Sequence, residues 1–361
     1  MKTTVLKLDP VNPDINKISE ASEFIKSGKV VIFPTETVYG IGADAFNEGA
    51  CKRIFEVKGR PADNPLIVHV PSLDMASEIG EIPEGYLEIL KRVWPSPITI
   101  VVKSTGKLSK TVTGGLGTVA IRMPAHPVAL ELIKQSGTPI VGPSANPSKK
   151  PTATNAKQAI NYFDGKVDCI IDAGRAFFGV ESTVIDLDTF TILRPGPFTP
   201  EEIEKAFEKK PRISDVSKGY ASLEKAVSPG TKYAHYAPET MLLLFPGKPD
   251  KLIEVLDNIE DLPPFAFLGS AESCDLLSSA LGCSTVALGS GNDMYDVAKS
   301  LYDGLIALDS LKVKFGIIES FDEKGIGLAI MNRIRKACSL ASFKSEEELS
   351  TLLELSVQYP I

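Results

Sequence analysis

KVVIF at residues 29–33 and PTETVYGIG at residues 34–42 decide how the first half of the chain folds. The apolar run is typical of a buried strand, and Pro34 ends it. The hydroxyls and glycines that follow predict a turn that presents backbone N–H groups and short side chains to a ligand, with an ordinary polar loop as the alternative. Residues Gly40 to Ala45 match the glycine pattern of a dinucleotide-binding site, but in such a site the first glycine directly follows the strand. Here Pro34 to Tyr39 lies between the strand and the glycine, so a dinucleotide site is not expected.

Outward from this stretch, strand-like and helix-like segments alternate up to about residue 208. Many prolines and glycines interrupt the alternation, so a clean series of parallel units is not expected. We predict an α/β domain built on a twisted, mixed sheet. Its expected strands are 66–70, 98–103, 119–122, 169–172 and 182–186, and its expected helices are 47–57 and 128–135.

The last third of the chain alternates more regularly between strands and helices. This pattern predicts a smaller, Rossmann-like domain with a parallel sheet over residues 239–361. Between the two domains, residues 209–238 have few aliphatic side chains and are far longer than an ordinary loop. We interpret this connection as a linker and candidate active-site lid, because its end carries His235 and Tyr236, which a spacer does not need.

Composition excludes several classes of protein. The 361 residues are 43% hydrophobic, which indicates a folded protein of about two domains. Lys plus Arg number 39 and Asp plus Glu 46, a net charge of −7, which argues against coating a polyanion but allows a local basic pocket. The five cysteines form no CxxC pair, and neither a signal peptide nor a membrane span is evident. We therefore expect a cytoplasmic protein whose cysteines are buried.

Two cations and an amide stand close together in VKGRPADNPLIVHV, residues 57–70. Lys58 and Arg60 lie at a predicted helix end, Asn64 follows, and His69 is carried by the next strand. Arginine binds phosphate with two parallel hydrogen bonds and lysine acts as a point charge, so this segment suits a phosphate chain. The alternative is basic residues that complement the end of a helix dipole.

Further polar motifs surround a third cation, Arg122, which ends an apolar strand. A buried arginine needs a carboxylate, either from the protein or from a ligand. The other motifs are GPSANPS at 142–148, FGVESTVID at 178–186 and LRPGP at 193–197. Since they contain no evident pair of nucleophile and base, they indicate a site that works by positioning and electrostatics, as adenylyl transfer does.

Taken in this order, the motifs resemble the YrdC-type threonylcarbamoyl-AMP synthases. The resemblance rests on PTETVYG, KGRPADNPL with His69, WPSPIT, IRMPAHP, PSAN, GVESTVID and LRPG, and it departs only at Ser96, where the family often has glycine. SPGTKYAHYAP at 228–238 and GIGLAIMNRIRKA at 325–337 are similar to the long, two-domain subtype.

The resemblance implies that L-threonine, bicarbonate and ATP give L-threonylcarbamoyl-AMP and pyrophosphate. A separate transferase would then modify tRNAs that read ANN codons, so tRNA is an indirect partner. Mg²⁺ would accompany ATP, with no prosthetic group and no protein metal site assigned. The resemblance places threonine at Thr37, His69, Arg122 and Ser182; it places the nucleotide at Lys58, Arg60, Asn64, Thr118, Ser144, Asn146, Thr152 and Arg194, with Lys58 and Arg60 in catalytic roles.

Three alternatives belong to other classes. An RNA-binding module is disfavoured by the net charge. A carbamoyl-transfer maturation factor would add zinc-type cysteine pairs and an acylphosphatase module, which the chain lacks. A threonine sensor without catalysis would have no use for the cations of the expected ATP site.

Overall fold

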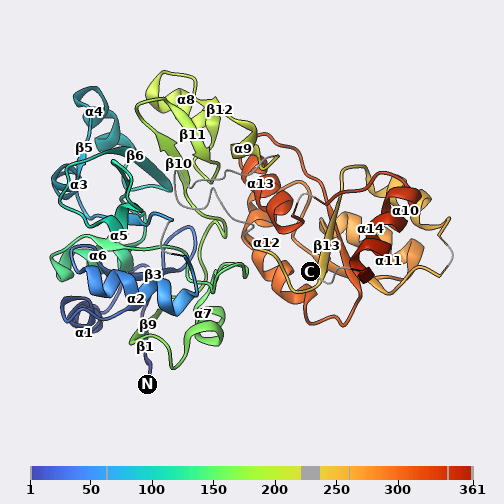
Figure 1. The fold of residues 1–361 in the computed structure, drawn as a ribbon, viewed down its shortest axis with the longest axis horizontal. Coiled ribbons are helices and arrows are strands. Elements are labelled where there is room, and N and C mark those ends of the chain that lie inside the picture. The colour runs from blue at the N-terminus through green and yellow to red at the C-terminus, as the bar shows by residue number, and fades with distance from the viewer. Residues whose placement is uncertain (1, 62–63, 221–235, 260, 340, 359–361) are drawn as a thin grey trace. The chain divides into compact units, whose positions relative to one another are not determined.

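The structure is a computed structural model that describes residues 2–61, 64–220, 236–259, 261–339 and 341–358 (Figure 1). The chain divides into two compact units. Unit 1 comprises Met1–Ser148 and Thr152–Tyr233, and unit 2 comprises Lys149–Pro151 and Ala234–Ile361. Residues 221–235, which are half of the candidate lid and include His235, lie outside the described residues.

Unit 1 is built on one twelve-stranded sheet. Its strand order is β1-β9-β2-β3-β8-β4-β7-β6-β10-β11-β12, with β5 paired to β6. Parallel and antiparallel pairs both occur, so the predicted mixed sheet is confirmed. The strands are β1 (Thr4–Lys7), β2 (Val31–Phe33), β3 (Gly40–Asp44), β4 (Ile67–His69), β5 (Gly80–Glu81), β6 (Ile98–Ser104), β7 (Thr118–Arg122), β8 (Ile140–Val141), β9 (Cys169–Asp172), β10 (Thr183–Asp186), β11 (Thr191–Arg194) and β12 (Arg212–Ile213).

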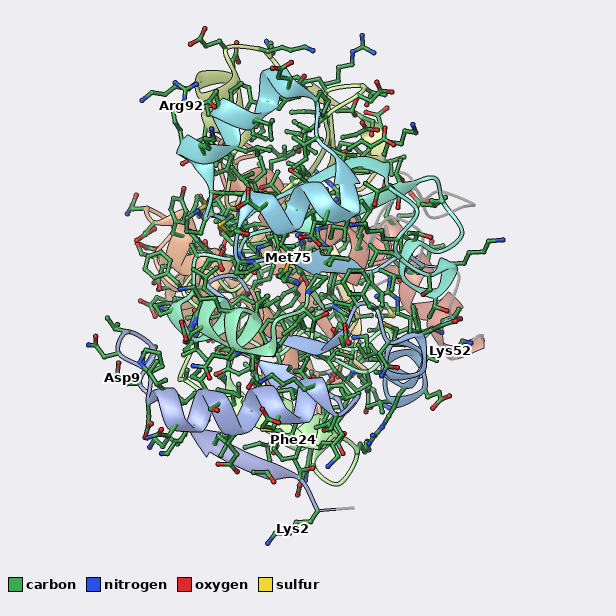
Figure 2. The ribbon with its side chains drawn as sticks, turned by 90° about the vertical axis from the view of Figure 1, so that its left-hand side faces the viewer. Lys2, Asp9, Phe24, Lys52, Met75 and Arg92 are labelled. Atoms are coloured by element: carbon green, nitrogen blue, oxygen red, sulfur yellow. The ribbon has the colours of Figure 1, made fainter. Side chains whose placement is uncertain are left out.

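Helices pack on both faces of this sheet. On one face, α1 and α6 cover strands β1, β9 and β2; Figure 2 shows α1, marked by Phe24, beside α6. The larger core lies on the opposite face against the other long helices. The helices are α1 (Ile15–Lys26), α2 (Glu48–Lys58), α3 (Leu73–Ile79), α4 (Glu84–Val93), α5 (Lys110–Thr113), α6 (Pro127–Ser136), α7 (Ala156–Phe163), α8 (Pro200–Phe207) and α9 (Asp215–Lys218).

The glycines after PTETVY form a strand rather than a turn. β3 pairs antiparallel with β2, and only the segment between them is a loop. A Cβ at Gly42 would lie 2.6 Å from the Phe33 ring and 2.8 Å from Ile140, so glycine is required by close packing. The sequence pattern missed this strand because its residues are small and lack the usual β-branched side chains.

Unit 2 confirms the predicted parallel sheet. Its strands run in the order β13-β16-β14-β15, and all three pairs are parallel. The elements are β13 (Met241–Phe245), α10 (Pro249–Leu256), β14 (Phe265–Gly269), α11 (Ala271–Leu281), β15 (Ser284–Ala287), α12 (Met294–Leu308), β16 (Phe315–Glu319), α13 (Gly327–Ala337) and α14 (Glu346–Gln358).

The carboxyl edge of this second sheet contains a carboxylate of its own. Glu319, at the end of β16, accepts hydrogen bonds from the Ser270 backbone N–H at 2.6 Å and from the Ser273 hydroxyl at 2.7 Å. Both donors lie at the start of α11, the position where α/β sheets commonly hold a ligand phosphate. Glu319 therefore satisfies the anion-binding end of α11 from within the chain.

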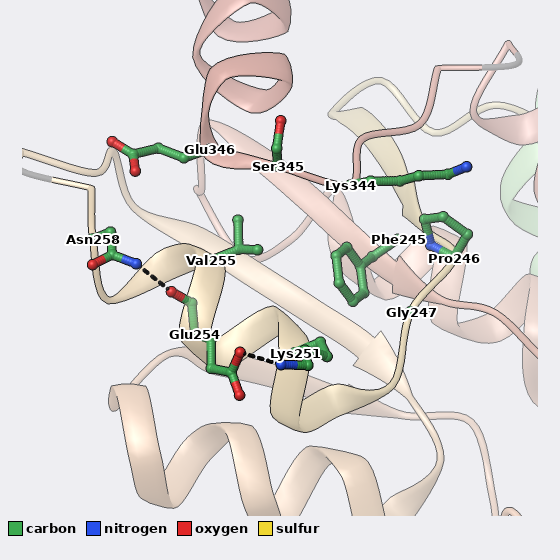
Figure 3. A pocket seen from close by; sticks show the side chains of 10 residues that line it. All are labelled: Phe245, Pro246, Gly247, Lys251, Glu254, Val255, Asn258, Lys344, Ser345 and Glu346. Carbon is green, nitrogen blue, oxygen red and sulfur yellow. Dashed lines mark hydrogen bonds and ion pairs between the residues drawn. The ribbon is translucent and has the colours of Figure 1, made fainter.

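Unit 2 also has an open cavity of about 620 Å³ between α10 and the start of α14 (Figure 3). Two of the charged residues that line it form an ion pair: Lys251 contacts Glu254 at 2.5 Å, and both side chains are exposed. Four of the five cysteines are buried, as expected, and Cys283 is half-buried. Within the described ranges, no helix has both the length and the apolar character needed to cross a bilayer.

Candidate active site

A row of polar side chains crosses four neighbouring strands of unit 1. His69 on β4 is in register with Arg122 on β7, and Arg122 is in register with Thr99 on β6. The Thr99 hydroxyl lies 2.8 Å from the hydroxyl of Ser182, which directly precedes β10. Because alternate residues of a strand share a face, the neighbouring Ile67, Val101, Ala120 and Val184 form a small apolar cluster on the same face as this row.

At the centre of the row, Arg122 is paired with a carboxylate from the protein. Its Nη2 lies 2.6 Å from Oε1 of Glu36, and both side chains are buried. The prediction that Arg122 needs a carboxylate is consistent with this pair, although Glu36 was not anticipated as the partner. Among the described residues, neither oxygen of Glu36 accepts a hydrogen bond, and Nε of Arg122 has no acceptor.

Two buried histidines flank this ion pair. Burial, together with the charge of Arg122, holds the pKa of His69 well below its usual value of 6.5. Burial also lowers the pKa of His126 to about 4, and the nearby Glu36 only partly offsets the effect. Both rings are therefore neutral near pH 7, which leaves Arg122 and Glu36 as the charges of this group.

Glycine at position 142 allows His69 to lie where it does. A Cβ at Gly142 would stand 2.7 Å from two atoms of the imidazole and 3.0 Å from Phe33. The rings of Phe33 and His69 also meet edge to face, with centroids 5.7 Å apart. Gly142, the first residue of GPSAN, must therefore be glycine so that the His69 ring fits in the row.

Arg194 continues the row onto β11. Its Nε and Nη2 donate to the carbonyl oxygen of Ser182, and Nη2 also reaches the Ser182 hydroxyl at 3.1 Å. Gly196 explains why LRPG can approach GVEST so closely, because a Cβ there would lie 2.3 Å from the backbone N of Thr183. The two motifs form one packed unit.

Lys58, the last residue of α2, reaches the loop that follows β8. Its ammonium donates to the carbonyl oxygen of Asn146 at 2.6 Å and to that of Ser144. Burial lowers its pKa well below 10.5, and the charge of Arg60 acts in the same direction. The Ser144 hydroxyl donates to Oδ1 of Asn146 at 2.6 Å, so the structure brings these three predicted nucleotide residues together.

Threonine hydroxyls extend the network. Thr152 donates to Oε1 of Glu181 at 2.9 Å, and Glu181 precedes Ser182 in the chain. The Thr37 hydroxyl lies 2.9 Å from that of Thr35, in the loop between β2 and β3. The carbonyl oxygen of Thr37 accepts from the Gly179 N–H at 3.0 Å, which connects PTETVYG to the GVEST motif.

The remaining predicted residues are placed less tightly. Arg60 is half-buried, and its Nη2 lies 3.4 Å from the carbonyl oxygens of Asn64 and Pro65. The Asn64 side chain is fully buried, and neither of its polar atoms has a hydrogen-bond partner among the described residues. Thr118 begins β7 and Arg122 ends it, so about 13 Å of strand separates them.

Of the two candidate lid residues, the structure describes Tyr236. It is buried in unit 2, where its ring lies 5.2 Å from that of Tyr302 on α12. The lid assignment of His235 and Tyr236 stays a prediction.

Sequence reasoning missed Glu36, Thr99, His126 and Glu181 as members of the site. Each lies inside one of the sequence motifs named above, so a position near the site is consistent with the sequence. Their contacts could not be expected, because these join side chains from separate motifs. In the part of the chain that the structure describes, no group of three His, Cys, Asp or Glu side chains could hold a metal ion.

Comparison with known proteins bears directly on this site. A family model described as "Telomere recombination" matches residues 23–196, and one described as "Threonylcarbamoyl-AMP synthase, C-terminal domain" matches residues 198–339. The threonylcarbamoyl-AMP synthase of Pyrococcus abyssi is 44% identical over 324 residues, which cover 89% of this chain and 94% of the relative. The chain belongs to the threonylcarbamoyl-AMP synthase family. The synthase of Bacillus subtilis is 41% identical over 335 residues, covering 91% of this chain and 95% of that protein.

Solved structures extend the likeness to the family's fold. The crystal structure of P. abyssi Sua5 complexed with L-threonine superposes with a TM-score of 0.87 at 41% identity, covering 94% of this chain and 99% of that one. A variant of the same synthase, with a consecutive histidine and tyrosine both changed to alanine, superposes with a TM-score of 0.86 at 40% identity, covering 94% of this chain and 98% of that one. The two-domain organisation of the family thus extends over nearly the whole of this chain.

Proposed function

We propose that this chain makes L-threonylcarbamoyl-AMP and pyrophosphate from L-threonine, bicarbonate and ATP. The reaction would take place on the face of the unit 1 sheet that carries the row of polar side chains. The observation that carries the proposal is the burial of three cations, Lys58, Arg122 and Arg194, each no more than 5% exposed. Cationic side chains are rarely buried unless an anion or a hydrogen-bond network accompanies them. A carboxylate and a triphosphate are substrates that suit such a face.

Threonine would bind at the His69–Arg122–Thr99–Ser182 row. Arg122 would take the threonine carboxylate with its guanidinium, an interaction that planar, paired donors make well. The imidazole of His69 is neutral, so it adds no second positive charge beside Arg122. The hydroxyl groups of Ser182 and Thr37 would be partners for polar groups of the amino acid.

The nucleotide would bind where Lys58, Ser144 and Asn146 meet, with Arg60, Asn64, Thr118, Thr152 and Arg194 as further contacts. Asn64 is fully buried, and over the described residues its amide has no hydrogen-bond partner, which suits recognition of a polar ligand atom. Lys58 and Arg60 would stabilise negative charge that moves from the α-phosphate onto pyrophosphate. Magnesium would enter bound to the ATP phosphates, which supply oxygen ligands for it.

The chemistry balances in two steps. Bicarbonate takes up a proton and loses water to give CO₂. The threonine ammonium gives up a proton, and the resulting neutral amine forms an N–C bond to the CO₂ carbon and loses a second proton. A carbamate oxygen then forms a bond to the α-phosphorus of ATP while the α–β bridging P–O bond breaks. Positioned cations are what this second step requires from the protein, because negative charge develops on the leaving pyrophosphate.

The product would be passed to a separate transferase that modifies tRNA. A mixed anhydride of a carbamate and a phosphate reacts with water, so a synthase benefits from a site that excludes it. The net charge of −7 argues against a role in coating tRNA directly.

Pyrophosphate release tests the proposed function. The protein is mixed with Mg-ATP, bicarbonate and L-threonine, and pyrophosphate is measured with each substrate omitted in turn. We expect release that requires both L-threonine and bicarbonate, and a loss of at least a hundredfold in Arg60→Ala. The matched control is Arg92→Ala, because Arg92 is an exposed arginine on α4 (Figure 2). Equal pyrophosphate release with and without L-threonine would contradict the proposal.

A further inference from the structure

We propose that Glu36 binds the α-ammonium group of the amino acid substrate, so that Arg122 and Glu36 together recognise a zwitterion. The inference rests on the proposed function, in which Arg122 takes the threonine carboxylate. It gives Glu36 a role in substrate binding in addition to its ion pair with Arg122.

The first support is the geometry of the pair. Arg122 Nη2 and Glu36 Oε1 are 2.6 Å apart, yet the contact does not have hydrogen-bond geometry. Both oxygens of Glu36 and the Nε atom of Arg122 therefore keep their capacity for hydrogen bonds, judged over the described residues. Buried polar atoms of folded proteins are nearly always satisfied, so unsatisfied atoms on both members of one ion pair indicate a missing polar ligand.

The second support is the balance of charge. The histidines beside the pair are neutral near pH 7, because burial lowers the pKa of each. One positive and one negative side chain then lie side by side, away from water. A free amino acid also carries one charge of each sign, on an ammonium and a carboxylate that are bonded to the same carbon atom. When its carboxylate meets Arg122 and its ammonium meets Glu36, every charge gains an opposite partner and the site remains neutral.

The third support is competition for the arginine. Without a substrate, Glu36 neutralises Arg122. An incoming carboxylate competes with Glu36 for the guanidinium, and loss of the existing contact would leave the Glu36 carboxylate buried without a counter-ion. The ammonium of the same substrate removes this penalty. A ligand with the carboxylate and hydroxyl of threonine but no amine would not, so the pair selects amino acids against hydroxy acids.

A pair of ligands tests the inference. L-Threonine and (3R)-3-hydroxybutanoate differ by the α-amine, and calorimetric titration gives the dissociation constant of each for the full-length protein. Wild type should prefer threonine. In Glu36→Gln we expect threonine to bind at least tenfold more weakly and the hydroxy acid several-fold more tightly, because the competing charge has gone. If Glu36 had only a structural role, Glu36→Gln would weaken the binding of both ligands to a similar degree.

Two variants complete the design. Glu36→Asp keeps the negative charge and should keep the preference for threonine, even if the shorter side chain weakens binding. Glu48→Gln, an exposed glutamate on α2, should leave both constants unchanged. If Glu36→Gln weakens both ligands equally or leaves threonine binding unchanged, the role of Glu36 is overturned while the threonine site stands. If the wild-type protein binds no threonine, the proposed function fails and this inference fails with it.

Discussion

The side chain of Arg194 is fixed to the main chain of Ser182. Nε and Nη2 of the arginine donate to the serine carbonyl oxygen, at 3.1 and 2.9 Å. The serine hydroxyl in turn contacts Thr99 on the next strand. Strands β6, β10 and β11 are therefore joined by side chains as well as by their backbone ladder, at the end where the candidate active site lies.

Arg194→Lys should lower the stability of the protein. A lysine ammonium cannot reproduce two donors held in one plane, so the buried carbonyl oxygen of Ser182 loses part of its hydrogen bonding. We expect the free energy of unfolding to fall by about 1–3 kcal/mol, measured by urea denaturation. The control is Arg212→Lys on β12, where the arginine is exposed. Equal stability of the two variants would contradict this role of Arg194.

Gly142→Ala should damage the threonine site through His69. The added methyl group would stand 2.7 Å from the imidazole, so the ring must move. We expect KM for threonine to rise at least tenfold and KM for ATP to change much less, measured by pyrophosphate release. In Gly85→Ala the methyl group meets nothing within 4 Å, so both constants should stay as in wild type. A normal KM for threonine in Gly142→Ala would show that the position of His69 is unimportant.

The elements that could be predicted from sequence are those with strong periodicity. β9 occupies the predicted residues 169–172, and the predicted strand 98–103 and helix 128–135 lie within β6 and α6, because each is a clear apolar or amphipathic run. β3 was missed, since Gly40 and Gly42 are poor strand formers that close packing against Phe33 requires.

The same distinction applies to the site. Sequence motifs predicted which segments contribute, and the structure brings Lys58 to Ser144 and Asn146. The pair of Glu36 and Arg122 could not be predicted, because only the folded sheet and its connecting loops bring two such distant residues together. Charge alone indicated that Arg122 needed a carboxylate, but it could not distinguish the protein's own from that of a ligand.

The activity should fall at alkaline pH because of Lys58. Burial lowers the pKa of this ammonium, so it loses its proton at a lower pH than an exposed lysine does. We expect kcat to decline as pH rises through that lowered pKa. In Lys58→Arg the decline should move to higher pH, since a guanidinium stays protonated. Lys52→Arg, at an exposed position on the same helix, should keep the wild-type profile. An unchanged profile in Lys58→Arg would contradict the assignment.

Acid should destabilise the folded protein through His126. Folding lowers the pKa of this imidazole from 6.5 to about 4, so between these values the unfolded chain binds more protons than the folded one. The free energy of unfolding therefore falls as pH falls from 6.5 towards 4, by up to about 3 kcal/mol from this group. His126→Asn, which cannot take up a proton, should show a shallower fall in urea denaturation across that range. An equally steep fall in the variant would mean that His126 does not contribute.

The most direct measurement of the central claim follows the carbon atom of bicarbonate. Labelled bicarbonate, L-threonine and Mg-ATP are incubated with wild type, Arg122→Gln and Arg92→Gln, and the adenylate fraction is separated and counted. We expect label in a threonine-containing adenylate with wild type and Arg92→Gln, and a loss of at least a hundredfold with Arg122→Gln. Absence of labelled adenylate from the wild-type reaction, or equal labelling by all three proteins, would contradict the account.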